Sequence, residues 1–203
     1  MGKLISIVGN SGVGKTTLAG ALQGVGDYFV GLEEHTTRPF HDLCASDPER
    51  YGLANQFDFL LLRVEQEQVI RQQPRPGLVD GGLDMDFWGF AHLFHHKGIL
   101  SAAEFLLCQR FYHAVRALTP PPDLLIFLDA PPEVVLERYR LRGRGHELTQ
   151  ADDLHQLDVF LRRWLAEQVV GNTAVVHLNA TTDQYLQPPS LQQLHHTIQT
   201  HLA

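Results

Sequence analysis

A glycine-rich segment with the sequence GNSGVGKTT occupies residues 9–17, between an apolar run and a stretch with helical periodicity. It satisfies the pattern G-x-x-x-x-G-K-[ST], in which glycine lets the backbone wrap around phosphate groups and the N-terminus of the next helix faces them. Lys15 supplies a cation for the outer phosphates, and the hydroxyl of Thr16 is a suitable ligand for Mg²⁺. We therefore predict that a nucleoside triphosphate binds to Gly9, Asn10, Ser11, Gly12, Val13, Gly14, Lys15, Thr16 and Thr17.

A second group of cations lies in the segment RYRLRGRGHE, at residues 138–147. Glycines beside Arg142 and Arg144 would let this segment close over a nucleotide as a lid. The guanidinium groups of Arg142 and Arg144 would then stabilise the charge on a transferred phosphoryl group, and Arg138 would contact the nucleotide. A solvated basic loop is the alternative interpretation, but a phosphate loop in the same chain favours the lid.

The elements that must position these residues alternate between short apolar runs and longer segments of helical period. This alternation predicts one α/β domain over residues 1–203, a three-layer α/β/α arrangement with a five-stranded parallel sheet. The functional site is expected at the carboxyl ends of the strands. The predicted strands are residues 4–8, 28–32, 77–80, 124–128 and 174–178. Helices are expected to begin near residues 15, 55, 102, 132 and 152, and a last helix over about residues 190–201.

Composition narrows the class of partner. The net charge of −7 disfavours a polymeric nucleic acid, whereas a small phosphate ligand needs only a few local donors. No apolar run approaches the length of a membrane span and no signal-like segment opens the chain, so we expect a cytoplasmic protein without membrane contact. Cys44 and Cys108 lack the spacing of a metal site and are expected to be buried free thiols.

Five segments together resemble the deoxynucleoside kinases, in particular the bacterial deoxyadenosine and deoxyguanosine kinase type. They are the phosphate loop, LEEHTTRPF, DPERY followed by QFDFLLLR, LVDGGLDMDFWGFA, and PDLLIFLDAPPEVVLERYRLRGRGHE. The resemblance extends to about Trp164 and so covers most of the chain. It implies Mg-ATP as phosphoryl donor, the 5′-hydroxyl of a nucleoside-like small molecule as acceptor, and a helix-packed homodimer.

The resemblance also assigns roles to individual residues. It places the carboxylate that receives the proton of the acceptor hydroxyl at Glu33, with Glu34 as the alternative. Gln56, Arg63 and Asp86 match the group that recognises the base of the acceptor. Asp80, at the end of the third predicted strand, is available together with Thr16 to hold Mg²⁺.

Departures from the family pattern leave the acceptor open. Gly81 stands where the family usually has an arginine near the acceptor's 5′ position, and Lys97 or Arg38 could supply the missing cation. Ala45 stands in place of a tyrosine that contacts the sugar, and a sugar-binding glutamate aligns with Gln156, beside Asp158. Glycine at residues 81 and 82 would open space for a larger group. A nucleoside monophosphate kinase and a catalytically impaired nucleotide-binding regulatory protein are therefore the alternatives.

Overall fold

The computed structural model describes residues 2–31, 38–142, 152–168 and 173–202. Five strands form one parallel sheet in the order β2-β3-β1-β4-β5. All five predicted strands are confirmed, and their ends within the described residues differ from the prediction by one residue at most. The strands are β1 (Leu4–Gly9), β2 (Phe29–Gly31), β3 (Gly77–Asp80), β4 (Leu124–Asp129) and β5 (Ala174–Asn179).

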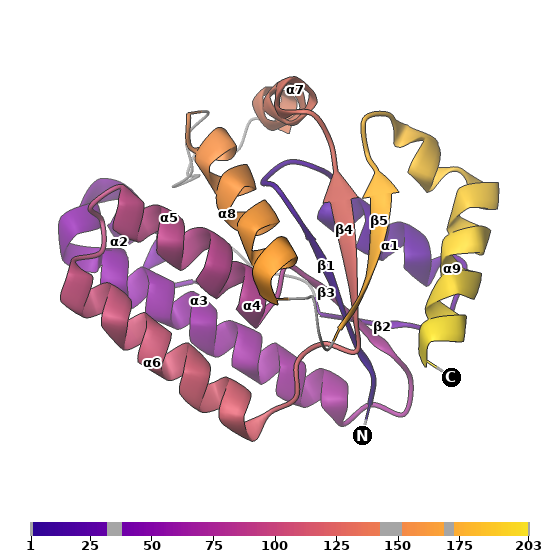
Figure 1. The fold of residues 1–203 in the computed structure, drawn as a ribbon, viewed down its shortest axis with the longest axis horizontal. Helices are drawn as coiled ribbons and strands as arrows, with labels where there is room; N and C mark the ends of the chain where they lie inside the picture. The colour runs from indigo at the N-terminus through magenta and orange to yellow at the C-terminus, as the bar shows by residue number, and fades with distance from the viewer. Residues whose placement is uncertain (1, 32–37, 143–151, 169–172, 203) are drawn as a thin grey trace.

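Helices cover both faces of this sheet, which confirms the three-layer prediction (Figure 1). One face is covered by α1 and α9, and the other by α3, α6 and α8. The helices are α1 (Lys15–Gln23), α2 (His41–Ser46), α3 (Pro48–Arg71), α4 (Leu83–Met85), α5 (His92–His96), α6 (Ala102–Leu118), α7 (Pro132–Arg142), α8 (Asp153–Gln168) and α9 (Pro188–Leu202). A π-helical segment, Asp86–Ala91, joins α4 to α5, and a 3-10 helix, Asp183–Leu186, precedes α9.

Successive side chains of each strand point to opposite faces of the sheet, and this divides the apolar core into two clusters. Ile126 of β4 packs in the cluster beneath α1 and α9, whereas its neighbours Leu125 and Phe127 pack in the cluster beneath α3 and α8. This follows from the pleat, because successive side chains of a strand point to opposite faces. A strand covered on both faces must be apolar throughout, and β1 is buried along its whole length.

The central position of β1 places the predicted site residues at one edge of the sheet. In register, Ile7 of β1 lies beside Asp80 of β3 and beside Ile126 of β4. Because parallel strands share one direction, the segments that follow β1, β3 and β4 all leave the sheet at the same edge.

One predicted helix boundary is wrong. Helix α3 begins at Pro48 and not near Asn55. Its first turn is fixed by Asp47, whose side chain accepts a hydrogen bond from the N–H of Arg50 at 3.2 Å, and proline is favoured at this position because it needs no N–H partner. The run from Leu83 to His96 is also helical, where no helix was predicted.

No helix in the described ranges is both long and apolar enough to cross a membrane. Cys44 and Cys108 are buried free thiols, as predicted, and burial raises the pKa of each to about 11.

Candidate active site

The predicted phosphate loop connects the central strand β1 to helix α1. Gly14 precedes the helix with a φ of +112°, a left-handed conformation that glycine adopts far more readily than other residues. The first turn of α1 has neither an acidic residue nor a side-chain cap, so the positive end of the helix remains for an anion. The Nζ atom of Lys15 lies 3.1 Å from the carbonyl oxygen of Gly9 and 3.0 Å from that of Asn10. This arrangement suits a phosphate group, and binding of a nucleotide by these residues stays a prediction.

Thr16 and Asp80 meet at the edge of the sheet. The hydroxyl of Thr16, in the first turn of α1, donates a hydrogen bond to the carboxylate of Asp80, the last residue of β3. The contact follows from strand order, because β3 is the neighbour of β1 and ends beside it. A hydroxyl and a carboxylate are the hard oxygen ligands that Mg²⁺ prefers. The predicted metal pair is therefore brought together.

The side chains of Asn10 and Arg138 form hydrogen bonds that connect the predicted phosphate loop to later parts of the chain. The amide Nδ2 of Asn10 donates to the carbonyl oxygen of Leu154 in α8 at 2.7 Å, and Asn10 Oδ1 accepts from the N–H of Ser11 at 2.8 Å. The guanidinium of Arg138 in α7 donates to the carbonyl oxygens of Val13 and Ala180 and to the carboxylate of Asp183, at 3.2, 2.7 and 2.8 Å. Arg138 thus lies against the loop between β1 and α1, and its predicted contact with a nucleotide stays a prediction.

Tyr185 lies beside the loop between β1 and α1 and was not predicted to do so. Its hydroxyl lies so close to Gly14 that a methyl group on that glycine would collide with it. Tyr185 is buried and follows β5, at the carboxyl edge where the site was expected. An aromatic residue in the segment after the last strand was the signal that could have identified it.

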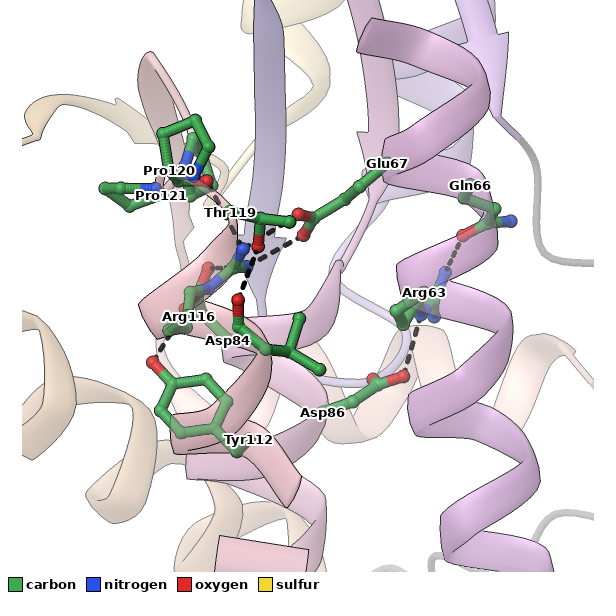
Figure 2. Close-up of polar contacts among 12 residues, drawn as sticks. Arg63, Gln66, Glu67, Asp84, Asp86, Tyr112, Arg116, Thr119, Pro120 and Pro121 are labelled. Carbon is green, nitrogen blue, oxygen red and sulfur yellow. Dashed lines mark hydrogen bonds and ion pairs between the residues drawn. The ribbon is translucent and has the colours of Figure 1, made fainter. Parts of the chain in front are cut away.

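The three predicted base-recognition residues converge from two elements. Arg63 and Gln56 lie on α3, and Asp86 begins the π-helical segment; all three are 3% exposed or less. The Nε atom of Arg63 donates to Oδ2 of Asp86 at 2.7 Å, and Nε2 of Gln56 donates to the backbone oxygen of Asp86 at 3.1 Å. Arg63 also donates to Oε1 of Gln66 at 3.1 Å (Figure 2). The structure brings the group together; its role in recognition stays a prediction.

A second buried polar cluster lies beside this group and was not predicted. Arg116 of α6 forms two-fold contacts with both Asp84 and Glu67, at 2.7–2.9 Å, and Asp84 also accepts from the hydroxyl of Tyr112 at 2.7 Å (Figure 2). Burial raises the pKa of Glu67, although the hydrogen bond from Arg116 opposes this. Burial and the Asp84 carboxylate raise the pKa of Tyr112. This cluster joins α3, α4 and α6, and so fixes the segment on which Asp86 lies.

The backbone at Gly81 suits glycine. Its φ is +87°, which an arginine would adopt only with strain. A Cβ atom at Gly81 would also lie 3.3 Å from Nη2 of Arg63, and one at Gly82 would lie 2.9 Å from the hydroxyl of Ser6. Arg63 and Ser6 thus line the positions that a Cβ atom would take at these two glycines, while room for a larger acceptor group stays a prediction.

The two cations considered as substitutes for the missing arginine have different partners. Lys97 forms an ion pair of 2.5 Å with Asp153, which ties the end of α5 to α8. Arg38 forms a longer contact of 3.4 Å with Asp58 of α3. The charge of Lys97 is thus matched more closely than that of Arg38.

The remaining predicted residues fall partly inside and partly outside the described ranges. Glu33, its alternative Glu34, and Arg144 lie outside the described residues. Arg142 ends α7, and its side chain is not described. Ala45 is exposed on α2, and Asp158 of α8 pairs with Arg162 at 2.6 Å.

Comparisons with known proteins give the family and the fold. The family model described as "Deoxynucleoside kinase" matches residues 5–202. The deoxyadenosine kinase of Dictyostelium discoideum is 34% identical over 146 residues, which are 72% of this chain and 59% of that protein. The deoxyadenosine/deoxycytidine kinase of Bacillus subtilis (strain 168) is 29% identical over 147 residues, 71% of this chain and 68% of that protein. The structure of deoxyadenosine kinase from M. mycoides with dCMP and dCDP bound has the same fold, with a TM-score of 0.80, 18% identity and 98% of each chain covered.

Proposed function

The chain belongs to the deoxynucleoside kinase family, and on that premise we propose that it transfers the terminal phosphoryl group of Mg-ATP to the 5′-hydroxyl of a deoxynucleoside. One observation carries the proposal. The Thr16–Asp80 pair beside the phosphate loop and the buried group of Gln56, Arg63 and Asp86 are joined by a single short segment, residues 80–86. A donor phosphate at one end and an acceptor base at the other would place the acceptor hydroxyl between them.

On the donor side, Lys15 and the backbone N–H groups at the start of α1 would bind the phosphates. Thr16 and Asp80 fit Mg²⁺, because both offer oxygen ligands at the end of the phosphate loop. When bound, Mg²⁺ would neutralise part of the phosphate charge. We assign Arg142 and Arg144 to stabilisation of the transferred group and Arg138 to the nucleotide, as the resemblance implies.

On the acceptor side, Glu33 is our choice for the carboxylate that orients the hydroxyl and takes its proton. The orientation of the Gln56 side chain indicates which kind of base the acceptor carries. A backbone carbonyl can only accept, so the Gln56 atom near the oxygen of Asp86 must be the NH₂ group. This orientation leaves Oε1 of Gln56 as a hydrogen-bond acceptor. It supports a base with an exocyclic amino group, as in adenine or cytosine.

A homodimer is part of the proposal. Leu61 of α3 and Leu106, Leu107 and Leu118 of α6 are exposed apolar side chains, and the two helices that carry them lie side by side (Figure 1). Phe57, Leu107 and Phe111 line an open pocket between these helices. A second copy of the chain, packed helix against helix, would bury these side chains.

A cytoplasmic location is proposed from the two free thiols, which suit a reducing compartment.

The test is direct detection of the phosphorylated acceptor. The protein is incubated with Mg-ATP and a panel of deoxyribonucleosides, ribonucleosides and their monophosphates. We expect product from a deoxynucleoside with an amino-bearing base. Lys15→Ala should lower turnover by about 10²–10³-fold, whereas Lys3→Ala, which removes a half-exposed lysine that pairs with Asp123, should leave it unchanged.

Two outcomes would contradict the proposal. Product from monophosphates alone would indicate a nucleoside monophosphate kinase. ATP binding without product from any acceptor would indicate a nucleotide-binding protein that lacks the acceptor reaction.

A further inference from the structure

Asn55 is the residue immediately before Gln56 on α3, and it is an exception among the buried polar side chains. It is 1% exposed, as is Gln56. Its Oδ1 atom is enclosed and has no hydrogen-bond partner in the part of the chain that the structure describes. Gln56, by contrast, is held by the backbone oxygen of Asp86.

The fold does not explain an amide at this position. A buried carbonyl oxygen without a partner costs about 1–3 kcal/mol relative to one that is hydrogen-bonded. Leucine has a similar size and a high helix propensity, and it would pack there without that cost. Unpaired buried polar groups are rare enough that each needs a specific reason, and a bound ligand is one.

The position of Asn55 along the helix places it near the acceptor group. Gly52 and Phe59 lie three residues before and four residues after it and therefore share its face of α3. Gly52 packs directly against Ile99, at the turn after α5, and Phe59 packs against His41, at the start of α2. Asn55 thus lies in the layer between α3 and these segments, next to Gln56.

Arg38 supplies a second polar atom in the same neighbourhood. Its Nε atom is also buried without a hydrogen-bond partner within the described residues. Its Nη1 atom contacts Asp58, which is three residues from Asn55 and so one turn along α3. A donor and an acceptor that have no hydrogen-bond partner among the described residues therefore lie on and beside the same part of α3.

We infer that Asn55 determines acceptor specificity, with its Oδ1 atom accepting a hydrogen bond from an N–H or O–H group of the acceptor molecule. The inference rests on the proposed function and deepens it. The donor on the acceptor molecule is the amino group of the base or the 3′-hydroxyl of the sugar, because these are the hydrogen-bond donors that deoxyadenosine and deoxycytidine carry away from the 5′ position.

The test compares Asn55→Leu with the wild type. Loss of one hydrogen bond to a neutral partner should raise the KM for the acceptor about 3- to 10-fold, with the KM for ATP unchanged. The unfolding temperature should stay equal or rise, since the variant removes an unpaired polar group. Gln192→Leu is the matched control, because it removes an exposed amide from α9 on the other face of the sheet; it should change neither KM.

Two further measurements make the result specific. Asn55→Ser keeps a neutral oxygen acceptor at this buried position and should raise the acceptor KM less than Asn55→Leu does. Acceptor analogues locate the partner. If the base amino group is the donor, wild type and Asn55→Leu will have the same KM for purine deoxyriboside, which lacks that group. If the 3′-hydroxyl is the donor, wild type and Asn55→Leu will have the same KM for 2′,3′-dideoxyadenosine, which lacks that hydroxyl.

The inference is overturned if Asn55→Leu lowers the unfolding temperature and leaves the acceptor KM unchanged, which is the behaviour of a structural amide. It is equally overturned if the KM ratio of the two proteins is the same for every analogue. Both results require that the wild type phosphorylates a deoxynucleoside, so they are distinct from a failure of the proposed function, in which the wild type gives no product.

Discussion

The Nε atom of Arg63 lies 2.7 Å from Oδ2 of Asp86, and these two charges from separate elements are both almost completely enclosed. An enclosed ion pair adds little net stability, because desolvation offsets the attraction, but removal of one partner leaves a buried charge without compensation. The pair therefore behaves as a unit, and the effects of substituting its two members on the free energy of unfolding should not add.

We predict that Asp86→Ala lowers the free energy of unfolding by about 3–5 kcal/mol. The double variant Arg63→Met/Asp86→Ala should recover most of that loss, because the unpaired charge is gone. Urea unfolding of the wild type, both single variants and the double variant gives the coupling energy. Additive effects of the two substitutions would show that the pair does not act as a unit.

The contact between Thr16 and Asp80 predicts a dependence on magnesium. Asp80→Asn removes a charged oxygen ligand and should raise the Mg²⁺ concentration for half-maximal activity about tenfold, as a loss of about 1.4 kcal/mol in ion binding would do. Thr16→Ser keeps the hydroxyl and serves as the control, with an unchanged magnesium titration. An unchanged titration in Asp80→Asn would remove Asp80 from the metal site.

Arg116 should be a strong determinant of stability, because it alone among the described residues contacts both Glu67 and Asp84 with a positive charge. Arg116→Met leaves two buried carboxylates unpaired and should cost about 3–5 kcal/mol. The matched control is Arg163→Met, which breaks an exposed pair with Glu167 and should cost less than about 0.5 kcal/mol. Denaturant midpoints measure both. Equal costs would contradict a structural role for this cluster.

Arg38, and not Lys97, is predicted to supply the cation missing at residue 81. Lys97 is already matched by Asp153 at 2.5 Å, whereas Arg38 lies 3.4 Å from Asp58. Arg38→Ala should lower turnover with the acceptor about tenfold or more, in line with the loss of a charged donor, and Lys97→Ala should have a smaller effect. Steady-state kinetics at saturating ATP decides this; unchanged turnover in both variants would end the hypothesis.

His92 predicts how stability depends on pH. Burial, followed by the charges of Arg163 and His95, lowers the pKa of His92 to about 4. The unfolded chain therefore takes up a proton near pH 6.5, before the folded protein does, so this residue stabilises the fold fully above that pH and progressively less as the pH falls toward 4. In urea unfolding at pH 7.5, 6 and 5, His92→Phe should show a smaller loss of stability on acidification than the wild type. His201→Phe, at an exposed position in α9, should match the wild type; a parallel loss in all three proteins would exclude His92 as the cause.

The residues of the phosphate loop and the strands could be predicted from the sequence because each depends on neighbours in the chain. The pattern from Gly9 to Thr16, between an apolar run and a helix, has few other uses, and buried parallel strands are marked by their own apolar residues. The start of α3 was also marked locally, by Asp47 and Pro48, and the prediction near Asn55 missed it because the apolar pattern was followed in place of the cap.

Only the tertiary structure decided which side chains meet across the chain. Arg116 donates a hydrogen bond to Glu67, which is 49 residues away in the sequence, and Arg138 donates one to the backbone oxygen of Val13, which is 125 residues away. No local pattern encodes such contacts, because they depend on the order of the strands and the packing of helices on the sheet. The same holds for the partnerless oxygen of Asn55, since any sequence can show an asparagine on a helix, but only the packed structure shows that nothing in the described chain pairs with it.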